Sequence, residues 1–224
     1  MNLPSIHGIS PHFLKKPEDY PKDSHFTGFW SGKSPVELDH GLIDFINQGE
    51  IPLLLTFGSM PFNSKLNLSK VLNKVTKELK VRLIVIKGWG LTDTNQLESN
   101  RAIKVISSAP YEKLFPLVKA VIHHGGIGTI AACLQAGKPF LCCPVLYPLG
   151  DQYFWGTIAF KKGIALKPIP LKNMTKDLFI SKVRELHNAE LLYSNCLRLM
   201  EKLKSENGLT NAINEIEKIP LTLG

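Results

Sequence analysis

Long apolar runs are missing from this sequence. No uninterrupted apolar stretch approaches the roughly 18 residues that a membrane-spanning helix needs. The first 23 residues carry prolines and charges where a secretory signal peptide would have its apolar segment. We therefore expect a cytoplasmic protein without a transmembrane helix.

Cysteine is also scarce, with four in 224 residues and none in a C-x-x-C pair. That spacing is typical of zinc sites and of thioredoxin-like redox centres, so neither is expected. Cys142 and Cys143 lie inside an apolar run, and Cys133 and Cys196 lie in segments with helical spacing. We expect all four to be buried, unreactive thiols, and we expect no metal site.

Clustered positive charge is absent, although the formal net charge is +8. The lysines are spread along the chain, and no basic cluster is interleaved with aromatic residues, which argues against nucleic-acid binding. A positive balance still suits a phosphorylated small molecule or peripheral contact with an anionic membrane face. Hydrophobic residues make up 44% of the chain and charged residues 21%, the proportions of an ordinary globular domain.

What the sequence does contain is a regular alternation of apolar strands and amphipathic helices. Helices are predicted between the strands and at the end of the chain, at 35–47, 66–80, 111–118, 128–135, 151–161, 175–188 and 190–218. Buried strands are predicted at 51–59, 81–88, 102–110, 119–124, 138–145 and 163–170, the last as an edge strand.

This order of elements predicts an α/β fold with a Rossmann-like, doubly wound, mostly parallel sheet covered by helices on both faces. Residues 1–35 are rich in proline and are interpreted as an irregular connector of the kind found between domains. Residues 36–224 are interpreted as the domain itself, with helices at its C-terminal end. Ligands of such folds bind in loops at the carboxyl ends of the strands.

A glycine-rich turn follows the fourth predicted strand, where His123 and His124 precede the run 125–129, GGIGT. Glycines let a ligand approach peptide N–H groups, and the start of a helix offers unpaired N–H groups with a partial positive charge. The Thr129 hydroxyl and the His124 ring add donors, so the chemistry favours a phosphate. Neither the Walker pattern nor G-x-G-x-x-G is present. A plain strand-to-helix turn with a core histidine is the alternative.

Two further segments have chemistry that suits the same ligand. The first strand ends in Gly58 and Ser59, whose N–H and hydroxyl groups can face a phosphate, although a simple turn explains them equally well. Asp151 and Gln152 follow the loop after the fifth strand, and a carboxylate beside a carboxamide can accept from and donate to vicinal sugar hydroxyls. Asp151 also suits a helix N-cap, and the two roles are compatible.

Taken in order, these segments resemble the nucleotide-sugar-binding motif of glycosyltransferases with the GT-B fold. The resemblance rests mainly on HHGGIGT, AGKP and the later Asp-Gln. Four further segments match the family in the same order along the chain: LLLTFGSM, VIKGWG, VISSAPYEKLFPLVKAVIHH and GIALKPIP. The lead-in SPHFLKKPEDYPKDSHFTGFW is similar to the segment that joins the two domains of the family. More narrowly, the chain resembles the UDP-dependent enzymes that include sterol glucosyltransferases, macrolide glycosyltransferases and plant secondary-metabolite enzymes. The resemblance implies their C-terminal, donor-binding half.

The resemblance implies which residues bind the diphosphate of the donor. His124, Gly126, Gly128 and Thr129 would hold it, assisted by Ser59. No metal or other cofactor is expected, because positive charge and N–H dipoles can stabilise the departing UDP without one.

The resemblance also implies contacts to the two ends of the donor. Asp151 and Gln152 would bind the hydroxyls of the transferred hexose, and Trp89, Ser108 and Ala109 would lie at the uracil. A glutamine at this place goes with glucose donors across much of the family, so UDP-glucose is the expected donor.

Two departures from the family pattern matter. A glutamate that grips the ribose in many members is replaced by Ala132, as is common in the sterol and bacterial branches. The acceptor-binding domain, which carries the catalytic base near its start, has no counterpart in this sequence. We therefore expect no catalytic residue here, and little transfer by this chain without an acceptor domain from a longer chain or a partner subunit.

Two functions are compatible with these residues. The first is the donor-binding half of an inverting glycosyltransferase that passes a hexose from a UDP-sugar to a lipophilic alcohol such as a sterol, the sterol resting on the resemblance alone. The second is a non-catalytic nucleotide-sugar-binding or interaction module. We also expect the chain to bind a partner or to self-associate. The regions expected to take part are Phe154, Trp155, the lead-in and the helix near 201–218.

Overall fold

The computed structural model describes residues 4–60, 66–88 and 94–219. Its central sheet has five parallel strands in the order β5-β4-β3-β6-β7. The strands are β3 (Leu53–Thr56), β4 (Leu83–Ile86), β5 (Ile103–Ile106), β6 (Val121–His123) and β7 (Phe140–Cys142).

The strand order creates a switch point between β3 and β6. Within this sheet the chain passes from β3 outward through β4 to β5, and then crosses back to β6 on the other side of β3. In open α/β sheets, ligands bind outside the carboxyl ends of the strands at such a reversal. The predicted Rossmann-like, doubly wound parallel sheet is confirmed.

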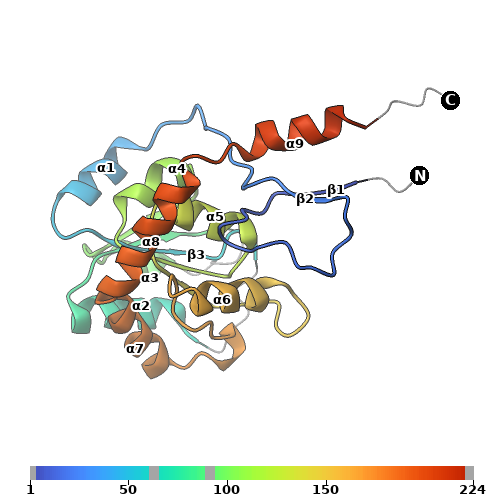
Figure 1. The fold of residues 1–224 in the computed structure, drawn as a ribbon. Coiled ribbons are helices and arrows are strands. Elements are labelled where there is room, and N and C mark those ends of the chain that lie inside the picture. Colours follow the sequence, from blue (N-terminus) through green and yellow to red (C-terminus); the bar gives the residue numbers. More distant parts are fainter. Residues whose placement is uncertain (1–3, 61–65, 89–93, 220–224) are drawn as a thin grey trace.

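Helices cover both faces of this sheet (Figure 1). Side chains alternate along a strand, so Leu53 and Leu55 face one layer while Leu54 faces the other. The first layer contains α2 (Leu68–Leu79), α3 (Asn95–Glu98) and α7 (Lys176–His187). The second contains α1 (His40–Asn47), α4 (Tyr111–Leu114), α5 (Ile127–Gln135), α6 (Gln152–Lys161) and α8 (Glu190–Leu203). Burial on both faces explains why the strands are continuous apolar runs in the sequence.

Local signals set several helix ends as the sequence predicts. Asn67 caps α2, because its side-chain oxygen accepts from the backbone N–H of Lys70 at 3.0 Å. Helix α5 ends before Gly137, which has a positive φ of 66°. The brief helix after β5 is interrupted near Pro116, where α4 gives way to a 3-10 turn at Phe115–Leu117. The four cysteines are free and buried, as predicted.

The segment 163–170 is not the regular edge strand that its apolar character predicts. It makes an isolated parallel bridge between Ala165 and Phe140. The N–H groups of Leu166 and Ile169 donate to carbonyls of β7, each at 3.0 Å, so the segment runs beside the sheet. Pro168 has no N–H to donate, and this interrupts the ladder.

The predicted helix at 190–218 is two helices, α8 and α9 (Gly208–Glu217). Asn207 begins the second one by accepting from the N–H of Thr210 at 3.2 Å. A Cβ atom on Gly208 would overlap the carbonyl oxygen of Phe29. The break is therefore fixed by close backbone contact with a distant part of the chain.

The lead-in is not wholly irregular. It contains a two-stranded parallel sheet of β1 (Ser5–His7) and β2 (Ser24–Phe26). Phe13 and Phe29 are buried in the same core cluster as α5 and α8. Ser10 donates to Glu206, between α8 and α9, with an Oγ–Oε1 distance of 2.5 Å. The lead-in thus packs as an integral layer of this structure.

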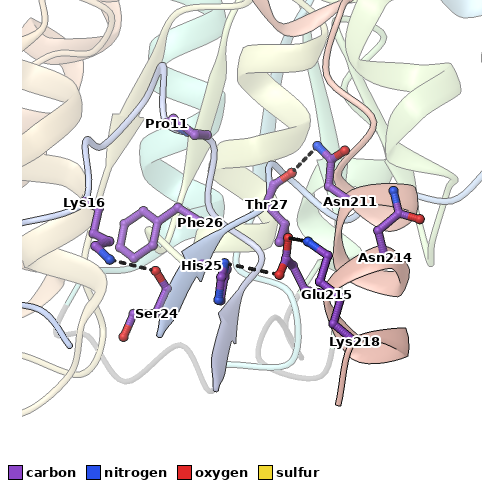
Figure 2. A pocket seen from close by; sticks show the side chains of 10 residues that line it. All are labelled: Pro11, Lys16, Ser24, His25, Phe26, Thr27, Asn211, Asn214, Glu215 and Lys218. Carbon is purple, nitrogen blue, oxygen red and sulfur yellow. Dashed lines mark hydrogen bonds and ion pairs between the residues drawn. The ribbon is translucent and has the colours of Figure 1, made fainter. Parts of the chain in front are cut away.

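Helix α9 lies along the lead-in at the end of the molecule where both termini emerge (Figure 1). Asn211 donates to the carbonyl of Thr27 at 2.9 Å, and His25 Nδ1 lies 3.4 Å from Glu215 Oε2, as Figure 2 shows. None of the helices in the described part of the chain has the length and apolar character needed to cross a bilayer.

Candidate functional site

Two loops meet at the switch point between β3 and β6. Thr56 and His123 are register partners at the carboxyl ends of these strands. The chain then turns through Gly58 on one side and through His124 on the other. A Cβ atom on Gly58, whose φ is +59°, would lie 3.4 Å from Cε1 of His124. The two segments that the sequence assigns to one ligand are therefore in contact.

The His124 ring is held over the glycine-rich turn. A Cβ atom on Gly126 would lie 2.5 Å from His124 Nε2, so any side chain at 126 would displace the imidazole. Its Nδ1 is buried, and no hydrogen-bond partner for it is found among the described residues. Burial lowers the pKa of His124, and the Asp151 carboxylate partly offsets this. A buried polar atom without a partner is costly, which fits a site completed by a ligand.

His123 has a different, structural role. It is fully buried, and its Nδ1 accepts from the backbone N–H of Gly125 at 3.0 Å. Its Nε2 lies 3.9 Å from Cys142 Sγ. Burial, with a smaller contribution from His124, lowers the pKa of His123 to about 3. His123 therefore stays neutral and supports the turn, as expected of a core histidine.

The start of α5 is open. Gly126 is its N-cap, no side chain caps it, and the first N–H groups have no partner within the helix. Gly128 is exposed, and a Cβ atom on it would meet nothing within 4 Å. Thr129 is only 8% exposed, so little of it faces the open space. Partial positive charge and free volume coincide here, which suits an anion.

The Asp151-Gln152 step lies on the same side of the sheet as this turn. A Cβ atom on Gly125, whose φ is +99°, would lie 2.9 Å from the backbone oxygen of Gln152. Asp151 is also close enough to act electrostatically on His124. The structure thus brings together the residues assigned to the diphosphate and those assigned to the hexose.

The two side chains of this step are held differently. Gln152 is 3% exposed, and its Oε1 accepts from the N–H groups of Val145 at 2.8 Å and Leu146 at 3.1 Å. Asp151 is exposed and occupies the N-cap position of α6, but it makes no capping hydrogen bond. Its Oδ2 instead accepts from Trp155 Nε1 at 2.7 Å.

The remaining predicted residues lie along the same edge of the sheet. Ser59 is exposed in the turn after β3. Ser108 is exposed and Ala109 is half-buried in the segment after β5, which is separated from β3 by β4. A Cβ atom on Gly88, whose φ is +53°, would overlap the carbonyl oxygen of Gly58, so the ends of β3 and β4 also meet. Trp89 lies outside the described residues.

Some supporting residues were not identified from the sequence. Trp155 orients Asp151, and its i, i+4 spacing on a predicted helix was a usable signal. The Thr56 hydroxyl lies 3.1 Å from the Tyr111 hydroxyl and accepts from the N–H of Gly58 at 3.3 Å. No sequence pattern indicates that contact. In the described parts of the chain, no three His, Cys, Asp or Glu side chains gather as a metal ion would require.

A separate hollow of about 490 Å³ lies between the lead-in and α9 (Figure 2). Its charged groups satisfy one another or the backbone. Lys16 donates to the carbonyls of Pro21, Lys22 and Ser24, and Glu215 pairs with both Lys218 and His25. This hollow belongs to the junction that attaches α9, and none of the residues that line it belongs to the glycine-rich turn.

Comparison with known proteins shows which enzymes this chain is similar to. No protein-family model matches the chain. The chain is 30% identical over 219 residues to a sterol 3-beta-glucosyltransferase of Arabidopsis thaliana, covering 97% of this chain and 35% of that protein. It is 32% identical over 218 residues to the O-mycaminosyltylonolide 6-deoxyallosyltransferase of Streptomyces fradiae, covering 96% and 49%. This chain is a homologue of glycosyltransferases. It spans about a third to a half of the length of these curated relatives.

Solved structures agree on the fold. The glycotransferase of kitacinnamycin superposes with a TM-score of 0.77 at 20% identity, covering 97% of this chain and 55% of that one. The glycosyltransferase VinC, solved in complex with DTDP, gives a TM-score of 0.70 at 18% identity, covering 92% and 51%. This chain therefore has the fold of one half of a GT-B glycosyltransferase, as its sequence predicted.

Proposed function

We propose that this chain binds a UDP-sugar, with UDP-glucose as the preferred donor, and forms the donor-binding half of an inverting glycosyltransferase. The observation that carries the proposal is the open start of α5 beside His124, at the switch point and on the same side as Asp151 and Gln152. One extended ligand can reach both groups. Homology to glycosyltransferases that include sterol glucosyltransferases supports this choice of ligand.

In this proposal each group acts on a different part of the donor. The first N–H groups of α5 stabilise the negative charge that grows on the diphosphate as the bond to the sugar C1 breaks. The Asp151 carboxylate accepts hydrogen bonds from sugar hydroxyls. The Gln152 carbonyl is already bound to the backbone of Val145 and Leu146, so its NH₂ group is the part left to donate to the sugar.

The chemical step needs a second component. An acceptor hydroxyl attacks C1 from the face opposite UDP, and a base in an acceptor-binding domain takes its proton. We propose that a longer chain or a partner subunit supplies this domain, and that the acceptor is a lipophilic alcohol such as a sterol. No group of this chain is assigned the role of base.

Calorimetry tests donor binding directly. The folded chain is titrated with UDP, UDP-glucose, UDP-galactose and TDP-glucose. We expect UDP to bind and UDP-glucose to bind more tightly than the other two sugar nucleotides. Absence of heat with all four, from a protein shown to be folded, would falsify the proposal.

A second measurement separates an enzyme half from a non-catalytic module. The chain is mixed with the acceptor domain of a homologous sterol glucosyltransferase, and transfer from UDP-glucose to a sterol is followed. Transfer that depends on both components supports the enzyme, whereas UDP binding without any gain of transfer supports a sensor or interaction module.

A further inference from the structure

A second hollow, of about 720 Å³, opens at the amino edge of the sheet, opposite the glycine-rich turn. The segments that enter β3, β6 and β7 form one side of it, at 49–51, 118–119 and 138–139. The junction between α7 and α8 forms the other side, at 186–190, together with Tyr193 and Ser194. This location separates it from every residue assigned to the donor.

An unpaired lysine lines this hollow. Lys138 is 8% exposed, and its ammonium makes no hydrogen bond or ion pair with the part of the chain that the structure describes. The ring of Tyr193 lies 5.5 Å from its Nζ. Burial lowers the pKa of Lys138, which reflects the cost of holding a charge there. Lys138 thus has a mostly buried side chain that lines the hollow, where an anion can approach its ammonium.

A histidine and a second lysine add further donors. Lys119 Nζ lies 3.3 Å from His187 Nε2. An ammonium can only donate, so Nε2 accepts and the neutral ring carries its proton on Nδ1. That Nδ1 is buried, and within the described residues it has no hydrogen-bond partner. Two of the three basic groups here therefore have donors that the protein does not satisfy.

The start of α8 contributes as well. This helix has 14 residues, its N-cap is Ala189, and no side chain caps it. The N–H of Glu190 already donates to the carbonyl of Asn188 at 3.0 Å, but the partial positive charge of the helix start remains beside the hollow that Ala189 and Glu190 line. The carboxylates of Glu50 and Glu190 are exposed, and neither pairs with Lys119 or Lys138 among the ion pairs of the described chain. Glu50 acts electrostatically on His187, but the ammonium groups of Lys119 and Lys138 remain free of carboxylate partners among these residues.

We propose that this hollow binds a small amphiphilic anion. Its phosphate or carboxylate group lies against Lys138 and Lys119, beside the positively polarised start of α8. Its apolar body covers Ile51, which is 57% exposed, together with the Tyr193 ring. A charged head and an apolar body match the two kinds of surface that the hollow offers. The site is independent of donor binding.

The test uses amide NMR spectra of the folded chain, titrated separately with phenyl phosphate, benzoate and uncharged benzyl alcohol. We expect phenyl phosphate or benzoate to shift amides at 49–51, 119, 138 and 187–194, and benzyl alcohol to shift them far less. The stronger of the two anions identifies the head group. Lys138→Gln should weaken anion binding by about tenfold, the loss of one charge-assisted hydrogen bond.

The controls keep the result decisive. Lys176→Gln removes an exposed lysine at the opposite end of α7 and should leave anion binding unchanged. If Lys138→Gln does not fold, Lys119→Gln takes its place with the same expected loss. The proposal is overturned if benzyl alcohol binds as well as the anions, if shifts are confined to 124–129, or if the folded lysine variant binds like wild type. UDP added to the same samples should shift 124–129 in wild type and variant alike, and its failure to do so bears on donor binding alone.

Discussion

The indole N–H of Trp155 donates a hydrogen bond to Asp151 Oδ2 at 2.7 Å, one turn along α6. This bond holds the carboxylate at the start of the helix without using it as a cap. Trp155 also packs against Phe13 of the lead-in, with ring centroids 6.3 Å apart. The orientation of a predicted sugar-binding group therefore depends on a segment that lies far away in the sequence.

Trp155→Phe should weaken binding of UDP-glucose by about fivefold and leave UDP binding unchanged. The phenyl ring keeps the packing but removes the donor, and one hydrogen bond at a partly exposed site contributes about 1 kcal/mol. Calorimetry with both ligands measures the difference. Phe160→Leu, at an exposed position near the far end of α6, is the control and should affect neither ligand. An equal loss for UDP and UDP-glucose would contradict the role assigned to Asp151.

Gly128→Ala should separate ligand binding from folding. A Cβ atom at 128 meets nothing within 4 Å, and alanine favours a helix over glycine, so stability should rise by up to about 1 kcal/mol. The methyl group fills the space assigned to the diphosphate, so UDP affinity should fall by about tenfold or more. Thermal unfolding and calorimetry test the two parts. Gly32→Ala, also in open space, should not change UDP affinity. Undiminished UDP binding by Gly128→Ala would place the diphosphate elsewhere.

His123 should make the fold sensitive to acid. Its pKa is about 3 when folded and about 6.5 when unfolded, so the unfolded chain takes up the proton first. The contribution of the neutral His123 to the free energy of unfolding is complete above about pH 6.5 and is lost as the pH falls toward 3. The loss amounts to about 1.4 kcal/mol per pH unit and about 5 kcal/mol in total.

Denaturant unfolding at several pH values measures this slope. His123→Asn, whose side-chain oxygen can replace Nδ1 as acceptor for Gly125, should flatten the slope below pH 6.5. His40→Asn, at an exposed position on α1, should keep it. An unchanged slope in His123→Asn would show that other groups control the acid sensitivity.

Phe13→Ala should show that the lead-in is part of the folded unit. Phe13 is fully buried in the cluster that contains α5 and α8, and truncating such a ring costs about 3–5 kcal/mol. Chemical denaturation measures the change, and Phe13→Leu should cost clearly less. If Phe13→Ala unfolds at the wild-type denaturant concentration, the lead-in is a loosely attached connector.

The sheet was predictable because its strands are buried on both faces and thus appear as continuous apolar runs. The break between α8 and α9 was missed, although residues 204–208 (KSENG) interrupt the apolar periodicity and include the capping Asn207. The contact that fixes its position, between Gly208 and Phe29, has no sequence signal. The segment 163–170 has a strand's composition, but Pro168 interrupts its hydrogen bonding.

The candidate site was also predictable only in part. The order of motifs along the chain predicted which loops carry candidate ligand groups, because parallel strands place their carboxyl ends at one edge. The orientation of the side chains could not be predicted from the sequence. The inward turn of Gln152 depends on the N–H groups of Val145 and Leu146, and the placement of His124 depends on the absence of side chains at Gly58 and Gly126.

Because β6 pairs with β3 but follows β4 and β5 along the chain, we expect the switch point to close late during folding. Neighbouring units such as β3-α2-β4 involve short loops, whereas joining β6 to β3 requires the intervening segment to lose more chain entropy. A nascent chain leaving the ribosome would contain most of its sheet before it could hold a nucleotide. A ligand bound across that last junction would lower the frequency of local opening between β3 and β6, and amide hydrogen exchange would slow there first.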